Sequence, residues 1–168
     1  MTLVLDVPTA LIPIDVQQAF DMEASSNPAM EANGLRLLSA WRGTGRPLIH
    51  VRHDSVQPGS PFQPGQPGNG LRPGFEPRDD EPLVSKSVNA AFIGTDLDLR
   101  LRRLGVQQVV LFGMTTDMCV STSARVAANL GYRTVIVGDA TACFDLAGPD
   151  GGTVPAADLH RAHLATLH

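Results

Sequence analysis

Short apolar runs alternate along this chain with longer stretches in which apolar residues recur at helical spacing. This alternation is typical of an α/β protein whose strands pair mainly in parallel. The apolar runs predict strands at residues 10–15, 47–51, 82–85, 108–112 and 133–137. The amphipathic stretches predict helices at residues 30–41, 96–104, 120–130 and 156–168. The order of these elements predicts a doubly wound, mainly parallel sheet of five to six strands with helices on both faces, a Rossmann-like three-layer sandwich.

Local signals set the expected ends and faces of these helices. Thr95 is expected to cap the helix that begins at residue 96, and Gly105 is expected to end it. Gly131 is expected to close the third helix in the same way. The apolar face of the first helix is expected to consist of Leu35, Leu37, Leu38 and Trp41.

Proline and glycine crowd residues 57–77 so densely that neither a helix nor a central strand is compatible with this stretch. We expect a long surface loop here. The loop is either an irregular connection or a wall or lid over a site, because long loops inside compact domains are often functional. A second flexible stretch is expected at residues 148–153, between the last strand and the last helix.

The length and composition narrow the class of protein. At 168 residues the chain predicts one domain, residues 1–168, with a hydrophobic core. A hydrophobic content of 43% and a net charge of -4 argue against disorder and against a basic surface for nucleic acid. No apolar run reaches the roughly 18 residues that cross a bilayer, and no Lys or Arg precedes the apolar N-terminus. We therefore expect a cytoplasmic protein without a targeting peptide.

Three residues that can carry chemistry follow different strands. Asp15 closes the first expected strand, Lys86 follows the third, and Cys119 lies between the fourth strand and the next helix. Ligands of open parallel sheets bind outside the carboxyl ends of the strands, so these side chains are expected to meet there. Lys86 is also the single lysine among 13 basic residues. A thiol beside this ammonium group, at a helix N-terminus, is expected to have a lowered pKa and to act as a nucleophile.

Three ordered motifs carry a resemblance to a known family. They are DVQQAF at residues 15–20, KSVNAAFIGTDL at 86–97 and GMTTDMCVSTSARVAANLGYRTVIVGDATA at 113–142. Together they resemble the isochorismatase-like cysteine hydrolases of the nicotinamidase/isochorismatase superfamily, and the resemblance runs from residue 10 to 168. It implies a catalytic triad of Asp15, Lys86 and Cys119.

The resemblance implies further details of the site. It implies a cis peptide bond between Met114 and Thr115, and an oxyanion hole formed by the N–H groups of Thr115 and Cys119. Residues of the first two motifs are expected to contact the substrate. For a phenylalanine among them, the alternative is a position in the hydrophobic core. These residues are Gln17, Phe20, Asn89 and Phe92.

No metal or other cofactor is expected. Nicotinamidases of this family bind a metal through an Asp and histidines after the second strand, but the spacing of an Asp followed two residues later by a His is missing here. His50, His53 and Asp54 are the alternative metal cluster, although we expect His53 or Asp54 to shape the pocket instead. His160 and His163 are expected to be ordinary residues of the last helix.

Several neighbouring residues are expected to have structural roles. Thr116 and Asp117 are expected to cap the helix that follows Cys119. The two cysteines are too few for a disulfide scaffold, and Cys143 is expected to be a small buried residue. Family members continue beyond the last helix into another strand. Because this chain ends at His168, we expect either a missing tail or a sheet one strand shorter.

These features predict a cysteine hydrolase that cleaves a small carboxamide or related C–N bond through a thioester acyl-enzyme. One alternative is an isochorismatase-type vinyl-ether hydrolase, which needs an acid but no nucleophile. Another is a noncatalytic binding protein on the same scaffold, because a fold does not establish a function. A redox role for Cys119 is a further alternative. We expect a small-molecule substrate, no nucleic-acid or membrane partner, and a homo-oligomer, either a dimer or a tetramer.

Overall fold

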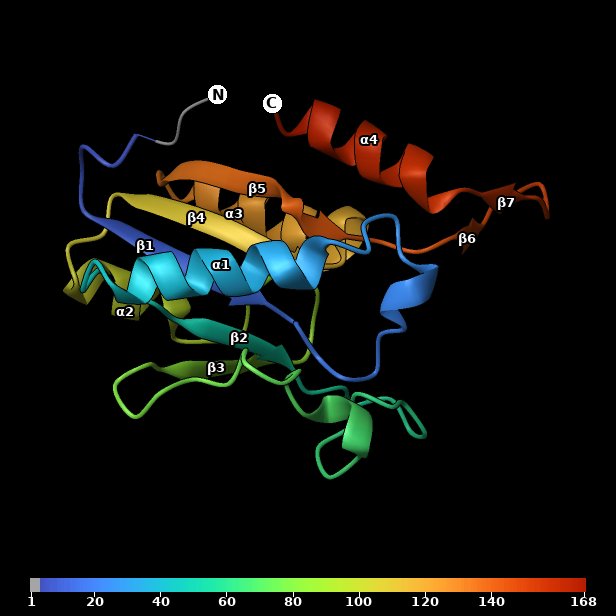
Figure 1. The fold of residues 1–168 in the computed structure, drawn as a ribbon, viewed down its shortest axis with the longest axis horizontal. Helices are drawn as coiled ribbons and strands as arrows, with labels where there is room; N and C mark the ends of the chain where they lie inside the picture. The colour runs from blue at the N-terminus through green and yellow to red at the C-terminus, as the bar shows by residue number, and fades with distance from the viewer. Residues whose placement is uncertain (1–3) are drawn as a thin grey trace.

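The computed structural model describes residues 4–168, so the first three residues of the predicted domain 1–168 lie outside the described residues. A five-stranded parallel sheet in the order β3-β2-β1-β4-β5 forms the centre of the fold (Figure 1). Its strands are β1 (Thr9–Ile14), β2 (His50–His53), β3 (Leu83–Lys86), β4 (Gln108–Met114) and β5 (Arg133–Ala142). The chain order reverses between β1 and β4, which opens a crevice at their carboxyl ends.

Helices cover both faces of this sheet, as the sequence predicts. They are α1 (Met30–Arg42), α2 (Leu97–Arg103), α3 (Ser121–Asn129) and α4 (Ala156–Thr166). α2 and α3 share one hydrophobic core with the sheet, whereas α1 belongs to the core on the opposite face. α4 lies beyond β5, where it contacts the turn before α3 (Figure 1). Within residues 4–168, no helix has both the length and the apolar character needed to cross a membrane.

β1 is buried on both faces because it lies at the centre of the parallel sheet. Its residues Ala10, Ile12 and Ile14 belong to the core of α2 and α3, and Leu11 belongs to the core of α1. This packing leaves the carboxyl end of β1 as the place where a polar residue can reach the crevice.

Several boundaries differ from the prediction. β2 begins later than expected, since Leu48 makes only an isolated bridge to Leu11. β4 and β5 run further than expected, through a register shift between Leu111 and Gly113. The stretch at 148–153 joins a short antiparallel pair that the sequence analysis missed, formed by β6 (Leu146–Ala147) and β7 (Thr153–Val154). Such short pairs carry too little periodicity to be detected from the sequence.

The expected apolar face of α1 is partly wrong. Leu35 is 38% exposed, and Gly34 faces the sheet instead. A Cβ atom at position 34 would lie 2.9 Å from the rings of Phe75 and Phe112. The helix therefore packs closely through a residue that a hydrophobic pattern does not count. Gly105 ends α2 as expected, with a φ of 66°. The start of α2 is one residue later than expected, so Asp96 is the N-cap in place of Thr95, although Leu97 N–H donates to Thr95 Oγ1 at 3.3 Å.

Candidate active site

A carboxylate, an ammonium and a thiol meet at the carboxyl edge of the sheet. Asp15 directly follows β1, Lys86 is the last residue of β3, and Cys119 lies in the π-helical turn η3 (Thr116–Val120) after β4. Lys86 Nζ lies 2.6 Å from Asp15 Oδ2 and 3.3 Å from Cys119 Sγ. The structure therefore places the ammonium group in contact with both the carboxylate and the sulfur.

The backbone around these residues departs from regular geometry. Asp15 has a φ of 51°, in the left-handed region that residues other than glycine seldom adopt, and such outliers cluster at functional sites. This conformation ends β1 and turns the chain at the crevice. The Met114–Thr115 peptide bond, at the end of β4, is cis.

Burial controls the protonation of this cluster. It raises the pKa of Asp15, against the opposing effect of the neighbouring Lys86 ammonium. Burial also raises the pKa of the Cys119 thiol to about 12, with a further increase from the Asp15 carboxylate. The expected lowering of the thiol pKa is therefore wrong for the resting protein, because burial and Asp15 outweigh Lys86. The resting sulfur is a thiol beside an ion pair.

Asp15 retains one oxygen that can accept a proton. Its Oδ1 is buried without a hydrogen-bond partner among the described residues, although buried polar atoms are normally paired. Asp15 and Cys119 each shift the pKa of the other. A carboxylate with a raised pKa and a free oxygen is suited to act as a general base toward the thiol.

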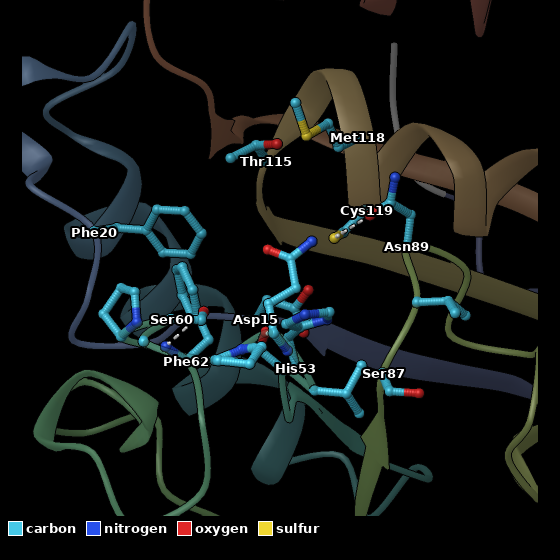
Figure 2. Close-up of a pocket in the computed structure, with 17 residues that line it drawn as sticks. Asp15, Phe20, His53, Ser60, Phe62, Ser87, Asn89, Thr115, Met118 and Cys119 are labelled. Atoms are coloured by element: carbon cyan, nitrogen blue, oxygen red, sulfur yellow. Dashed lines mark hydrogen bonds between the residues drawn. The ribbon is translucent and has the colours of Figure 1, made fainter.

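Asp15 and Cys119 line a cavity of about 620 Å³ (Figure 2). The cavity walls come from the segments that follow β1, β2 and β3 and from the turn that carries Cys119. Phe20, Asn89 and Thr115, all expected at the site, line the cavity. Asn89 Oδ1 lies 3.8 Å from Cys119 Sγ.

Gln17 and Phe92 do not line this cavity, so their expected substrate contacts are wrong. Gln17 is fully buried, and its side-chain amide donates to the carbonyl oxygens of His53 and Asn69 and accepts from His53 N–H. It therefore joins the ends of β1 and β2 to the loop. Phe92 packs in the core, with its ring 6.2 Å from that of Tyr132. The alternative of a core position holds for Phe92.

The loop rich in proline and glycine forms a fixed wall of the cavity. Ser55 N–H donates to Phe62 O at 3.0 Å, which closes the part of the loop that lines the cavity. Asn69 Nδ2 lies within hydrogen-bond distance of the carbonyl oxygens of His53 and Phe62 and of Asp54 Oδ1. Nothing in the local sequence around Asn69 signals these contacts to distant backbone, so its role could not be predicted from the sequence.

The alternative metal ligands point to different partners. His50 Nε2 lies 3.0 Å from Glu81 Oε2, and the Asp54 carboxylate accepts hydrogen bonds from Arg52 and Asn69. Only His53 reaches the cavity, where its Nδ1 lies 3.4 Å from Lys86 Nζ. Within residues 4–168, no three His, Cys, Asp or Glu side chains converge as a metal site requires. His53 therefore shapes the pocket, as expected, and these side chains do not fit a shared metal ion.

The expected capping role of Thr116 and Asp117 is wrong. Neither η3 nor α3 has a side-chain cap. Instead, Thr116 Oγ1 lies 2.9 Å from His160 Nδ1 on α4, while Asp117 Oδ1 is buried without a partner among the described residues. His160 thus connects α4 to the turn that carries the thiol. Cys143 is fully buried, as expected.

The fold and this site define an α/β protein with a thiol, an ammonium and a carboxylate at the crevice of a doubly wound sheet. The family model of the Isochorismatase domain matches residues 9–166. This chain belongs to the isochorismatase family of hydrolases.

Known relatives match along almost the whole chain. The isochorismatase family protein YrdC of Bacillus subtilis is 39% identical over 95% of this chain and 87% of its own length. Streptothricin hydrolase of Streptomyces noursei is 37% identical over 91% of this chain, which spans 57% of that protein. The crystal structure of an isochorismatase-family hydrolase from Chromobacterium violaceum is 39% identical and superposes with a TM-score of 0.91, covering 100% of this chain and 88% of the other.

Proposed function

We propose that this protein is a cysteine hydrolase that cleaves a small carboxamide or a related C–N bond through a thioester intermediate. Asp15, Lys86 and Cys119 are the catalytic residues of this proposal. The observation that carries it is the position of Lys86 Nζ, 2.6 Å from the carboxylate and 3.3 Å from the sulfur, behind the Asp15 and Cys119 side chains that line the cavity. The hydrolase family of the chain supports it.

The first half of the reaction begins with proton transfer from Cys119 to Asp15. The thiolate attacks the carbonyl carbon, and the carbonyl oxygen becomes an oxyanion. The proton transfer moves the negative charge from the carboxylate to the sulfur. Because Lys86 already contacts both groups, the charge stays next to the ammonium group throughout. Through this exchange, a thiol whose pKa burial raises to about 12 can become a nucleophile by giving its proton to Asp15.

The oxyanion needs donors that are oriented before the reaction. Thr115 lines the cavity, and its N–H has no hydrogen-bond acceptor among the described residues. We assign Thr115 N–H and Cys119 N–H to the oxyanion hole. The tetrahedral intermediate then collapses, the C–N bond breaks, and the nitrogen leaves with the proton held by Asp15.

The second half returns the protein to its resting state. Asp15 removes a proton from a water molecule, and the resulting hydroxide attacks the thioester carbonyl. The C–S bond breaks, the carboxylic acid product leaves, and the sulfur recovers the proton from Asp15. Each proton that Asp15 accepts is thus given back within the same half-reaction.

The test of this proposal is to trap the acyl-enzyme. The protein is mixed with an amide that releases ammonia, quenched in acid within one turnover, and measured by intact mass. We expect an added acyl mass on a peptide that contains Cys119 and none on Cys119→Ala protein. Ammonia release by Cys119→Ala protein at the normal rate would overturn the proposal.

Alkylation is expected to distinguish the two cysteines. At neutral pH, limiting iodoacetamide should label Cys119, because its half-buried sulfur faces the cavity and Lys86, whereas Cys143 is fully buried. The labelling rate should rise with pH, since only the thiolate reacts. Peptide mapping checks the site, and preferential labelling of Cys143 in the folded protein would contradict the assignment.

Chelation is expected to leave turnover unchanged, because His50 and Asp54 are held by Glu81 and by Arg52 and Asn69, away from His53. The measurement is the rate of ammonia release after dialysis against a strong chelator, with zinc, manganese or iron then added back. A loss of activity that one of these metals restores would show that the three residues do bind a metal.

A further inference from the structure

We infer that the cavity selects uncharged amides whose acyl group is aromatic or otherwise apolar, an inference that rests on the proposed function and defines its substrate class. The charge of the cavity, its aromatic wall and its rim all point to this class of ligand.

The described residues that line the cavity offer no unpaired charge to a substrate. Among the described residues that line it, Asp15 is the one that carries a formal charge, and Lys86 already neutralises it. The nearby Arg52 is engaged with Asp54 and does not line the cavity. A substrate carboxylate would therefore lose water without gaining a cation, and a substrate ammonium would find no free carboxylate.

The polar groups on the walls are neutral side chains. Asn89 and Ser87 lie across the cavity from the aromatic wall (Figure 2). His53 also faces the cavity, and burial lowers the pKa of its imidazole, which favours the neutral ring near pH 7. Neutral donors and acceptors of this kind suit the oxygen and nitrogen of an uncharged amide.

One side of the cavity is an aromatic wall. The ring centroids of Phe20 and Phe62 lie 4.9 Å apart. The Phe20 ring also stacks on the ring of Phe144, with their centroids 5.5 Å apart. His53 meets Phe62 edge to face at 6.1 Å. Because the hydrogen bonds of Asn69 and Ser55 hold the Phe62 backbone, this wall is in place before a ligand binds. A preformed aromatic wall favours a planar or apolar group.

The rim of the cavity is apolar as well. Val56, Val88 and Met118 all line it, and their side chains are 75%, 43% and 42% exposed. They come from three separate segments, after β2, after β3 and in η3, so they surround the mouth rather than form one local patch. An acyl group that reaches the mouth would bury these side chains further and gain from that burial.

A matched set of amides tests the inference. The probes are 4-methylbenzamide, which is neutral, 4-carbamoylbenzoate, which carries a carboxylate, 4-(aminomethyl)benzamide, which carries an ammonium, and acetamide, which lacks the ring. Ammonia release gives kcat/KM for each amide with the wild-type protein. Binding to Cys119→Ala protein is measured separately by calorimetry, so that the ligand class is read without any hydrolysis.

We expect the neutral aromatic amide to exceed each charged amide and acetamide by roughly tenfold or more, both in kcat/KM and in affinity. Equal or tighter binding of 4-carbamoylbenzoate or of 4-(aminomethyl)benzamide would overturn the inference, as would the absence of binding by the neutral amide. Binding of the neutral amide without any release of ammonia would support the ligand class and overturn the proposed hydrolase instead.

A charge placed in the cavity provides the matched control. Gln57 lines the wall and is exposed, so that Glu, of the same length, and the longer Arg can both be placed there without burial. Gln57→Arg should narrow the preference against 4-carbamoylbenzoate several-fold, and Gln57→Glu should do the same for 4-(aminomethyl)benzamide. An unchanged order of preference in both variants would contradict the view that missing counter-charges exclude charged amides.

Discussion

Asp15→Asn protein is expected to lose turnover by about a hundredfold to ten-thousandfold while its Cys119 thiol becomes more reactive toward iodoacetamide. The loss follows because Asn cannot accept the thiol proton or activate water, and general acid–base catalysis is worth about that much. The gain in alkylation follows because the Asp15 carboxylate raises the thiol pKa, whereas Lys86 lowers it. Removing the carboxylate leaves the buried ammonium with the thiolate as its best remaining partner.

The measurements are the initial rate of ammonia release and the rate of alkylation at pH 7, with circular dichroism and thermal melting to follow the fold. The double variant Asp15→Asn, Lys86→Met is the matched control, because it removes the ammonium together with the carboxylate. Its thiol should again react slowly. Slower alkylation in Asp15→Asn than in the wild type, or near-normal turnover, would show that Asp15 is not the base.

The proximity of Asp15, Lys86 and Cys119 could be predicted from the sequence because it depends mainly on the positions of the strands. The apolar runs mark parallel strands, and the carboxyl ends of such strands share one edge of the sheet. A residue that ends a strand is therefore placed by the fold itself. Lys86 Nζ indeed lies at this edge, 2.6 Å from Asp15 Oδ2 and 3.3 Å from Cys119 Sγ.

The roles of Gln17 and Phe20 could not be separated in the same way. Both follow Asp15, yet Gln17 is fully buried as an anchor of the loop while Phe20 lines the cavity. The difference depends on the left-handed backbone at Asp15 and on the hydrogen bond from the Gln17 side chain to Asn69 O, which lies far along the chain. Such long-range hydrogen bonds leave no periodic signal.

The protonation of Cys119 was also beyond the sequence. Position at a turn beside a lysine suggests a thiolate, but the pKa depends on how deeply the sulfur is buried and on which charges face it. Here burial and Asp15 together outweigh Lys86. The sign of the shift is thus a property of packing, and a thiol that was expected to have a lowered pKa has a raised one.

The remaining large effect is expected from Lys86→Arg. If a positive charge alone were sufficient, this variant would keep most of its activity, because Arg retains the charge and serves as the cation elsewhere in the chain. Lys86 instead occupies a fully buried point between a carboxylate and a thiol, with no exposed side-chain surface. The guanidinium is broader than the ammonium and would displace the carboxylate or the sulfur.

A displacement of this kind by about 1 Å can cost roughly a hundredfold in rate. We therefore expect both Lys86→Arg and Lys86→Ala to lose at least about a hundredfold in kcat while circular dichroism still shows the native fold. Binding of 4-methylbenzamide to each variant, measured by calorimetry, separates a damaged pocket from a damaged reaction, since Lys86 does not line the cavity wall. Near-normal turnover by Lys86→Arg would show that Lys86 contributes only diffuse charge, and the exchange of its partner from carboxylate to thiolate would no longer explain the reaction.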